Sequence, residues 1–201
     1  MKKSKIIVVE GPQGTGKTTL ANFFRENLSG SNLYRLSGQK DKTLTGKKYS
    51  IIMYDALIEY LQEMQVVPMD IIFDRTFFTE EVYGRLGYKE YSFTDEYQRL
   101  VKKFDELDYE IYYISLYLKD VELFRQRLAR ESHHNYQSFS LENSVNQQNV
   151  YKEIADELEQ NTNIKVIRME MDDFDVAYEK IREIFGIEKP KGVARIRKRE
   201  E

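Results

Sequence analysis

The sequence contains no cysteine, only three prolines and only ten glycines among its 201 residues. Without cysteine, the chain has no disulfide framework, no thiolate zinc site and no thiol nucleophile. No run approaches eighteen consecutive apolar residues, so we expect no membrane-spanning segment. The apolar run that follows the basic start, Ile6 to Val9, is too short for the core of a signal peptide. These absences favour a cytoplasmic protein that works away from membranes.

Charge is present in nearly equal amounts of both signs. The chain has 31 Lys and Arg against 34 Asp and Glu, a formal net charge of −3, which argues against a protein that mainly coats nucleic acid. A hydrophobic content of 41% excludes a disordered chain. We expect a single domain over residues 1–186 and a basic C-terminal tail over 187–201. The tail is expected to be a frayed terminus, with a basic arm that contacts nucleic acid as the alternative.

Short apolar runs alternate with segments of helical periodicity along the whole chain. Strands are expected at 6–9, 32–36, 69–73, 111–118 and 164–169, and helices at 18–28, 50–64, 94–107, 120–130, 149–160 and 174–185, with a further helix ending near Tyr83. This alternation predicts an α/β fold of three layers, with a mostly parallel five-stranded sheet and helices on both faces. The polar segments 37–48 and 132–148 lack periodicity, which predicts a mobile loop and a mobile lid at about 131–148.

One segment, between the first strand and the first helix, matches the Walker A pattern G-x-x-x-x-G-K-[ST] at every defined position. In this pattern, backbone N–H groups and a helix N-terminus surround phosphate oxygens. The residues expected to bind the phosphates of ATP are Gly11, Gln13, Gly14, Thr15, Gly16, Lys17, Thr18 and Thr19. Lys17 is expected to bridge the outer phosphates and Thr18 to hold Mg²⁺. The segment therefore predicts a site for ATP with Mg²⁺.

A second chemical signal lies at the end of the strand predicted at 69–73. The chain has no Asn-Lys-x-Asp segment of the GTPase type and is short for a motor ATPase, which leaves phosphoryl transfer to a small substrate. Asp74 and Arg75 come directly after the strand, and ligands bind at the carboxyl ends of strands in open parallel sheets. Asp74 is expected near Mg²⁺ or the acceptor, and Arg75 on an acceptor phosphate. A surface salt bridge is the alternative.

Arginines and aromatic residues supply further candidates. Arg127 and Arg130 point away from the apolar stripe of the 120–130 helix and lead into the predicted lid. They are expected to close over the triphosphate and stabilise the transferred group, unless they form a solvated helix face. Phe78 and Tyr83 are expected to contact the substrate, with packing in the core as the alternative. The two histidines, His133 and His134, receive no role.

Together these motifs resemble the thymidylate kinase branch of the nucleoside and nucleotide monophosphate kinases. The resemblance covers most of residues 5–185. Two parts of the resemblance lie around the phosphate loop: Val9-Glu10-Gly11 leads into the loop and Gly16-Lys17-Thr18-Thr19 ends it. A third part is the spacing between Asp74-Arg75-Thr76, Thr79 and Val82-Tyr83-Gly84, and a fourth is Tyr151 in a later helix. It implies a P-loop kinase fold and a homodimer. It also implies that Lys17, Arg75 and a lid arginine are catalytic, and that Arg35 helps to hold the acceptor phosphate.

Two departures from that family leave the acceptor open. Gln13 stands where the family often has an acidic residue, and the helix predicted at 50–64 has no arginine to lie over a thymine ring. The sequence predicts an ATP- and Mg²⁺-dependent kinase that phosphorylates a deoxynucleoside monophosphate. One alternative is a kinase acting on a hydroxyl of a nucleoside or of DNA or RNA. Another is an ATP-binding switch module without enzymatic activity.

Overall fold

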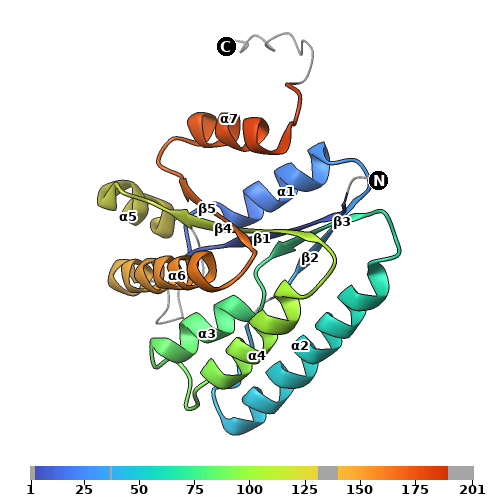
Figure 1. Ribbon diagram of the computed structural model, residues 1–201. Helices are drawn as coiled ribbons and strands as arrows, with labels where there is room; N and C mark the ends of the chain where they lie inside the picture. The colour runs from blue at the N-terminus through green and yellow to red at the C-terminus, as the bar shows by residue number, and fades with distance from the viewer. Residues whose placement is uncertain (1–2, 37, 131–139, 190–201) are drawn as a thin grey trace.

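Figure 1 shows a computed structural model of the chain, which describes residues 3–36, 38–130 and 140–189. Its strands are β1 (Lys5–Glu10), β2 (Ser31–Arg35), β3 (Asp70–Asp74), β4 (Glu110–Tyr117) and β5 (Lys165–Glu170). Its helices are α1 (Lys17–Asn27), α2 (Leu44–Met64), α3 (Phe77–Arg85), α4 (Thr94–Asp105), α5 (Val121–Ala129), α6 (Leu141–Asn161) and α7 (Phe174–Phe185). The strands pair in the order β2-β3-β1-β4-β5, and every pairing is parallel. The predicted α/β fold with a five-stranded parallel sheet is confirmed.

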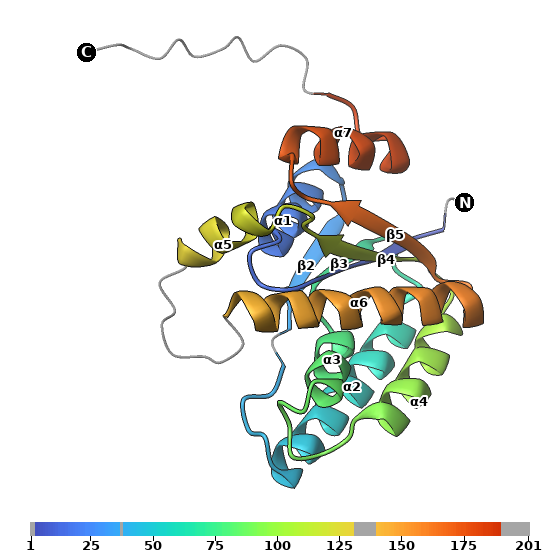
Figure 2. The ribbon, with the colours of Figure 1, turned by 90° about the vertical axis from the view of Figure 1, so that its left-hand side faces the viewer.

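The sheet separates two hydrophobic cores. Figure 2 shows α1 and α7 on one side of the sheet and α2, α3, α4 and α6 on the other. Within β1, Ile6 and Val8 pack into the core of α2, α3, α4 and α6, whereas Ile7 and Val9 pack into the core of α1, α5 and α7. Successive side chains of a strand point to opposite faces, so a continuous apolar run serves a strand that is covered on both sides. This places β1, and the loop that follows it, at the centre of the domain.

The two segments predicted to be irregular contain more helix than expected. Helix α2 begins at Leu44 rather than at Ser50, because the Thr43 side chain accepts a hydrogen bond from the Thr45 N–H and caps the helix. Helix α6 begins at Leu141, so residues 141–148 of the predicted lid are helical. Three polar residues of its first turns, Ser144, Gln147 and Gln148, are buried, which hides the helical periodicity. The Gln148 side chain, for example, bonds both backbone groups of Leu118. The remaining lid residues, 131–139, lie outside the described part of the chain.

The packed domain extends slightly further towards the C-terminus than the sequence predicts. Ile187, assigned to the tail by the sequence, is buried in the second core, and its N–H bonds the Arg182 carbonyl. The packed domain therefore reaches at least this residue, and the tail from residue 190 lies outside the description. Within the described ranges, none of the helices combines the length and the apolar composition that crossing a bilayer requires.

Candidate active site

The segment between β1 and α1 forms a tight loop with a positive φ at three glycines, which are Gly11, Gly14 (φ 82°) and Gly16. Gly11 and Gly16 have φ values of 146° and 88°, in the left-handed region. A Cβ atom at Gly11 would lie 2.7 Å from the Leu116 carbonyl oxygen, and one at Gly16 would lie 2.9 Å from the Phe174 ring. The loop is closed internally, because the Thr15 hydroxyl donates to the Pro12 carbonyl at 2.8 Å. The sequence motif thus has the left-handed glycine geometry that a phosphate cradle needs.

The cationic group of the loop is held in place from the inside. Lys17 begins α1, and its Nζ donates to the Pro12 carbonyl oxygen at 2.6 Å. The residue is buried, so its ammonium group lies within the loop rather than in solvent. A buried cation at the N-terminus of a helix makes the loop strongly attractive to phosphate oxygens. The role of Lys17 at the outer phosphates stays a prediction.

Side chains from three segments converge beside the loop, at the carboxyl edge of the sheet. The Thr18 hydroxyl donates to Asp74 Oδ2 at 2.6 Å, and Arg35 Nε lies 3.9 Å from the same oxygen. Arg75 donates to the Gln13 side-chain oxygen at 3.1 Å. The structure therefore brings together five predicted site residues that are up to 62 positions apart in the sequence. It places a carboxylate and two guanidinium groups next to a phosphate cradle.

The oxygen pair of Thr18 and Asp74 suits a magnesium ion. Mg²⁺ prefers hard oxygen ligands, and nucleotide sites usually supply one or two from the protein while phosphate and water complete the shell. Among the described residues, no group of three or more His, Cys, Asp or Glu side chains is arranged to hold a metal ion by itself. A metal at this edge would accordingly be held by Thr18, Asp74 and the phosphates of the nucleotide. Asp74 is nearly buried, which limits competition from bulk water.

Arg75 adopts a conformation that is unusual for a residue with a side chain. Its φ of 74° makes it the one non-glycine residue with a positive φ in the described part of the chain. Its N–H donates to the Val9 carbonyl at 3.2 Å, which ties the end of β3 to the end of β1. Left-handed backbone costs about 1 kcal/mol or more for such a residue and occurs most often at functional sites. The strain turns the Arg75 side chain towards the phosphate loop.

Glu10 is a candidate that sequence reasoning missed. It ends β1, is fully buried, and accepts hydrogen bonds from the Thr76 N–H at 2.7 Å and the Thr79 hydroxyl at 2.8 Å. Burial raises the pKa of its carboxyl to about 7, although the Thr79 and Thr76 hydrogen bonds and the nearby Arg75 and Lys17 favour the charged form. The feature of the sequence that could have identified Glu10 is its position, because a carboxylate directly after a buried apolar run has little access to water.

The structure corrects one predicted substrate contact and leaves a second open. Phe78 is fully buried in the core, where its ring packs 4.4 Å from Phe77 and 4.8 Å from Tyr113, measured between ring centroids. It faces inward because the first turn of α3 packs on the sheet, so the expectation that Phe78 contacts the substrate is wrong. Tyr83 is half-buried one turn further along and neighbours Arg75. Its role stays a prediction.

The two arginines predicted to act from the lid are Arg127, which lies within α5, and Arg130, which is the C-cap of that helix. Arg127 lies over the Phe174 ring, with its guanidinium carbon 4.3 Å from the ring centroid, and donates to the Met171 carbonyl at 2.8 Å. It is therefore held against the segment before α7 rather than directed at the phosphates. The Cβ of Arg127 would nevertheless contact a Cβ built at Gly14 of the loop, at 3.6 Å. Arg130 is the exposed residue at the end of α5.

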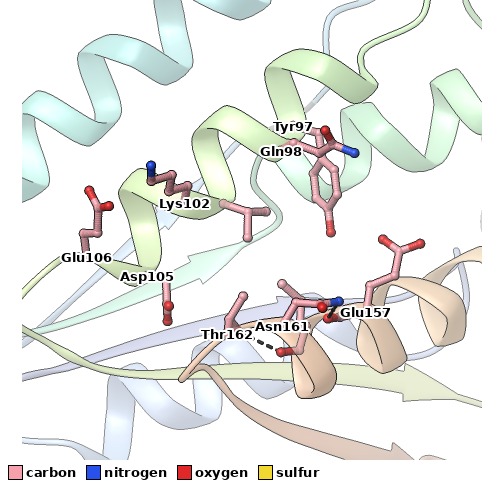
Figure 3. A pocket seen from close by; sticks show the side chains of 10 residues that line it. Tyr97, Gln98, Lys102, Asp105, Glu106, Glu157, Asn161 and Thr162 are labelled. Atoms are coloured by element: carbon pink, nitrogen blue, oxygen red, sulfur yellow. Dashed lines mark hydrogen bonds between the residues drawn. The ribbon is translucent and has the colours of Figure 1, made fainter.

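Two surface hollows lie away from this site. One, of about 440 Å³, runs between α4 and α6 and is lined by Tyr97, Lys102, Asp105 and Glu157 among others (Figure 3). The other, of about 520 Å³, lies at the amino end of the sheet beside Lys5 and Asp70. Neither includes a residue of the phosphate loop. The candidate active site is therefore assigned by its chemistry and not by the size of a cavity.

The fold has counterparts among solved structures. Thymidylate kinase from Candida albicans superposes with a TM-score of 0.63 and 16% sequence identity over 92% of both chains. Two structures of deoxyadenosine kinase from M. mycoides, one with bound dCTP and one with the products dCMP and dCDP, give TM-scores of 0.57 and 0.58 at 16% and 18% identity. Both matches cover 90% of this chain and 98% of the kinase. No family model matches the sequence, and the search of curated proteins found no relative. The chain has the three-layer P-loop kinase fold.

Proposed function

We propose that this protein is an ATP- and Mg²⁺-dependent kinase that transfers the γ-phosphate of ATP to a deoxynucleoside monophosphate. The observation that carries the proposal is the convergence of Lys17, Thr18, Asp74, Arg75 and Arg35 at one edge of the sheet. Two guanidinium groups beside the phosphate loop suit an acceptor that is itself an anion. The solved kinases with the same fold add support from their named activities.

In this proposal, each residue acts through position and charge. The loop amides and Lys17 hold the phosphates of ATP. Thr18 and Asp74 would hold Mg²⁺, which would neutralise charge on the donor phosphates. Arg75 approaches from the acceptor side and stabilises the negative charge that spreads over the transferred phosphoryl group. Arg35 orients the acceptor phosphate. Phosphoryl transfer needs little covalent participation by the protein, so preorganised charges account for most of the catalysis.

The donor nucleoside has a candidate location of its own. Arg127 and Phe174 form a cation–π pair next to Gly14 and Gly16 of the phosphate loop. Guanidinium groups and aromatic rings also bind the planar bases of nucleotides. We therefore assign Arg127 to the base of ATP and not to the phosphates, while Arg130 keeps its predicted role at the phosphates.

A second candidate function uses a hydroxyl as the acceptor. Asp74 is a nearly buried carboxylate beside the predicted phosphates, and deoxyadenosine kinase has the same fold. In that reaction Asp74 accepts the hydroxyl proton, the hydroxyl oxygen forms a bond to the γ-phosphorus, and the bond to the β-phosphate oxygen breaks to release ADP. The acceptor would be a nucleoside or an end or modified base of DNA or RNA.

One panel of assays tests the proposal. ADP release is measured with Mg-ATP and each of the four deoxynucleoside monophosphates, the matching nucleosides, and single- and double-stranded DNA. Turnover of a monophosphate, weakly dependent on salt, supports the first candidate. Turnover of nucleosides supports the second, and turnover of DNA that falls steeply with salt supports its nucleic-acid form. ATP binding without ADP formation on any acceptor contradicts both and leaves the switch module.

A further inference from the structure

The buried carboxylate of Glu10 grips both ends of one short turn. One oxygen, Oε1, accepts from the Thr76 N–H at 2.7 Å, and the other, Oε2, accepts from the Thr79 hydroxyl at 2.8 Å. Thr76 is the N-cap of α3, yet its side chain makes no capping hydrogen bond within the helix. In a capping box, an acidic side chain of the third helical residue accepts from the N-cap N–H. Here that residue is Thr79, and Glu10 supplies the carboxylate from β1.

This turn also fixes the conformation of Arg75. Arg75 lies between Asp74, the last residue of β3, and Thr76, whose N–H is bound by Glu10. The Arg75 N–H is bound by the carbonyl of Val9, the residue before Glu10. The peptide groups on both sides of the Arg75 Cα are thus tied to two consecutive residues of β1. A left-handed residue persists only where its surroundings determine it, and these are the hydrogen bonds that do so.

The hydrogen bonds extend from Glu10 to a third element. The Thr79 hydroxyl also lies 3.1 Å from the Tyr151 hydroxyl, which belongs to α6. Since Thr79 donates its single proton to an ionised Glu10, Tyr151 must donate to Thr79. The charged or titratable groups around Glu10 are the cations Arg75 and Lys17 and four tyrosines, of which Tyr54, Tyr113 and Tyr151 are buried and Tyr83 is half-buried. Burial raises the pKa of each of these tyrosines, which stay neutral around pH 7.

We propose that Glu10 is a positioning residue, whose ionised carboxylate clamps the Thr76–Thr79 turn and thereby aims Arg75 at the transferred phosphoryl group. The inference rests on the proposed function, in which Arg75 is catalytic. An amide or a protonated acid carries a donor in place of one acceptor, so it keeps both contacts only if the Thr79 hydroxyl turns to accept, and it lacks the charge that attracts the Thr76 N–H and the Thr79 hydroxyl together. The reversed and weaker contact loosens the turn and lets Arg75 relax from its left-handed conformation.

The test compares the kinetics of Glu10→Gln with those of a control variant in which another buried glutamate is also replaced by glutamine. Glu81 is also fully buried, but it lies on α3 and accepts hydrogen bonds from Arg85 and Thr94. Glu81→Gln is therefore the control. We expect Glu10→Gln to lower kcat about ten- to hundredfold, the effect of a misplaced catalytic group, while the KM for ATP stays within about twofold. Wild type should show a limb of kcat that rises with pH around the pKa of Glu10, about 7, and Glu10→Gln should lack it. Glu81→Gln should keep both kcat and the limb.

A second pair of variants covers the case in which Glu10→Gln does not fold. Thr79→Val removes the hydroxyl at nearly constant volume and should lower kcat, whereas Thr79→Ser keeps the hydroxyl and should restore it. Wild-type kcat and an unchanged pH limb in Glu10→Gln, or equal activity of the two Thr79 variants, would overturn the proposal. If wild type releases no ADP with any acceptor, the proposed function fails separately. Crystal structures then decide the positioning role, which is refuted if Arg75 keeps its positive φ in Glu10→Gln.

Discussion

The buried Glu10 carboxyl makes the stability of the fold depend on pH in a predictable direction. Its pKa is raised from 4.5 to about 7 in the folded protein, so the folded state binds a proton that the unfolded state releases at a lower pH. The stabilisation from this proton is complete below about pH 4.5 and is lost as the pH rises through about 7. Glu10 therefore destabilises the fold at neutral pH and above, relative to acidic conditions.

The size of the effect follows from the shift. Each pKa unit corresponds to about 1.4 kcal/mol, so the full shift is worth on the order of 3 kcal/mol. Between about pH 5 and pH 8 the loss is about 2–3 kcal/mol, because some of the titration lies outside that range. For a chain of this length, this corresponds to a fall in melting temperature of about 5–10 °C from Glu10 alone.

The assay is urea or thermal unfolding of wild type and of Glu10→Gln across this pH range. Groups such as Asp55 and Glu110, whose pKa is lowered mainly by hydrogen bonds with Arg99 and Lys165, contribute equally to both proteins and cancel in the difference. The stability of wild type relative to the variant should decline by about 2–3 kcal/mol from pH 5 to pH 8. A difference that stays constant with pH would refute the assignment of a raised pKa to Glu10. Glu81→Gln again serves as the control for loss of a buried carboxylate.

Four further predictions can be checked separately. Lys17→Ala should abolish phosphoryl transfer with an unchanged circular dichroism spectrum; turnover like wild type would contradict the role of the loop. Arg35→Ala should raise the acceptor KM about tenfold or more and leave the KM for ATP unchanged, as loss of a charged hydrogen bond predicts; steady-state kinetics would show a shared effect if Arg35 binds ATP. Phe78→Ala should destabilise the fold by about 3–5 kcal/mol, whereas Tyr83→Phe should cost little in the same unfolding assay. Light scattering should give twice the 24.0 kDa chain mass if the predicted homodimer forms.

Much of the fold could be predicted because its signals are local. Four mainly apolar runs and one shorter, more polar segment at 32–36 predicted the five strands to within one residue at each end. The alternation of strands and helices then restricted the sheet to a parallel one. The prediction failed at α2 and at the start of α6. There, Thr43 and Ser140 cap the helices and buried polar residues such as Ser144 and Gln147 conceal the periodicity.

Part of the candidate site could also be predicted from local sequence. The phosphate loop is a property of consecutive residues, because glycine at positions 11, 14 and 16 sets the backbone and Lys17 follows at the helix start. The amino-acid sequence by itself was sufficient for that part. It was also sufficient for placing Asp74 and Arg75 at a strand end, since the carboxyl ends of parallel strands share one edge.

Only the tertiary structure decided which side chains reach that edge and which do not. Phe78 turns into the core and Arg127 stacks on Phe174, although both follow sequence patterns that fit a substrate contact. The role of Glu10 depends on residues more than sixty positions away, which supply its hydrogen bonds and remove its water. Burial and hydrogen bonding between distant segments arise only when the chain is packed, and they determine the charge of this carboxyl and the direction of Arg75.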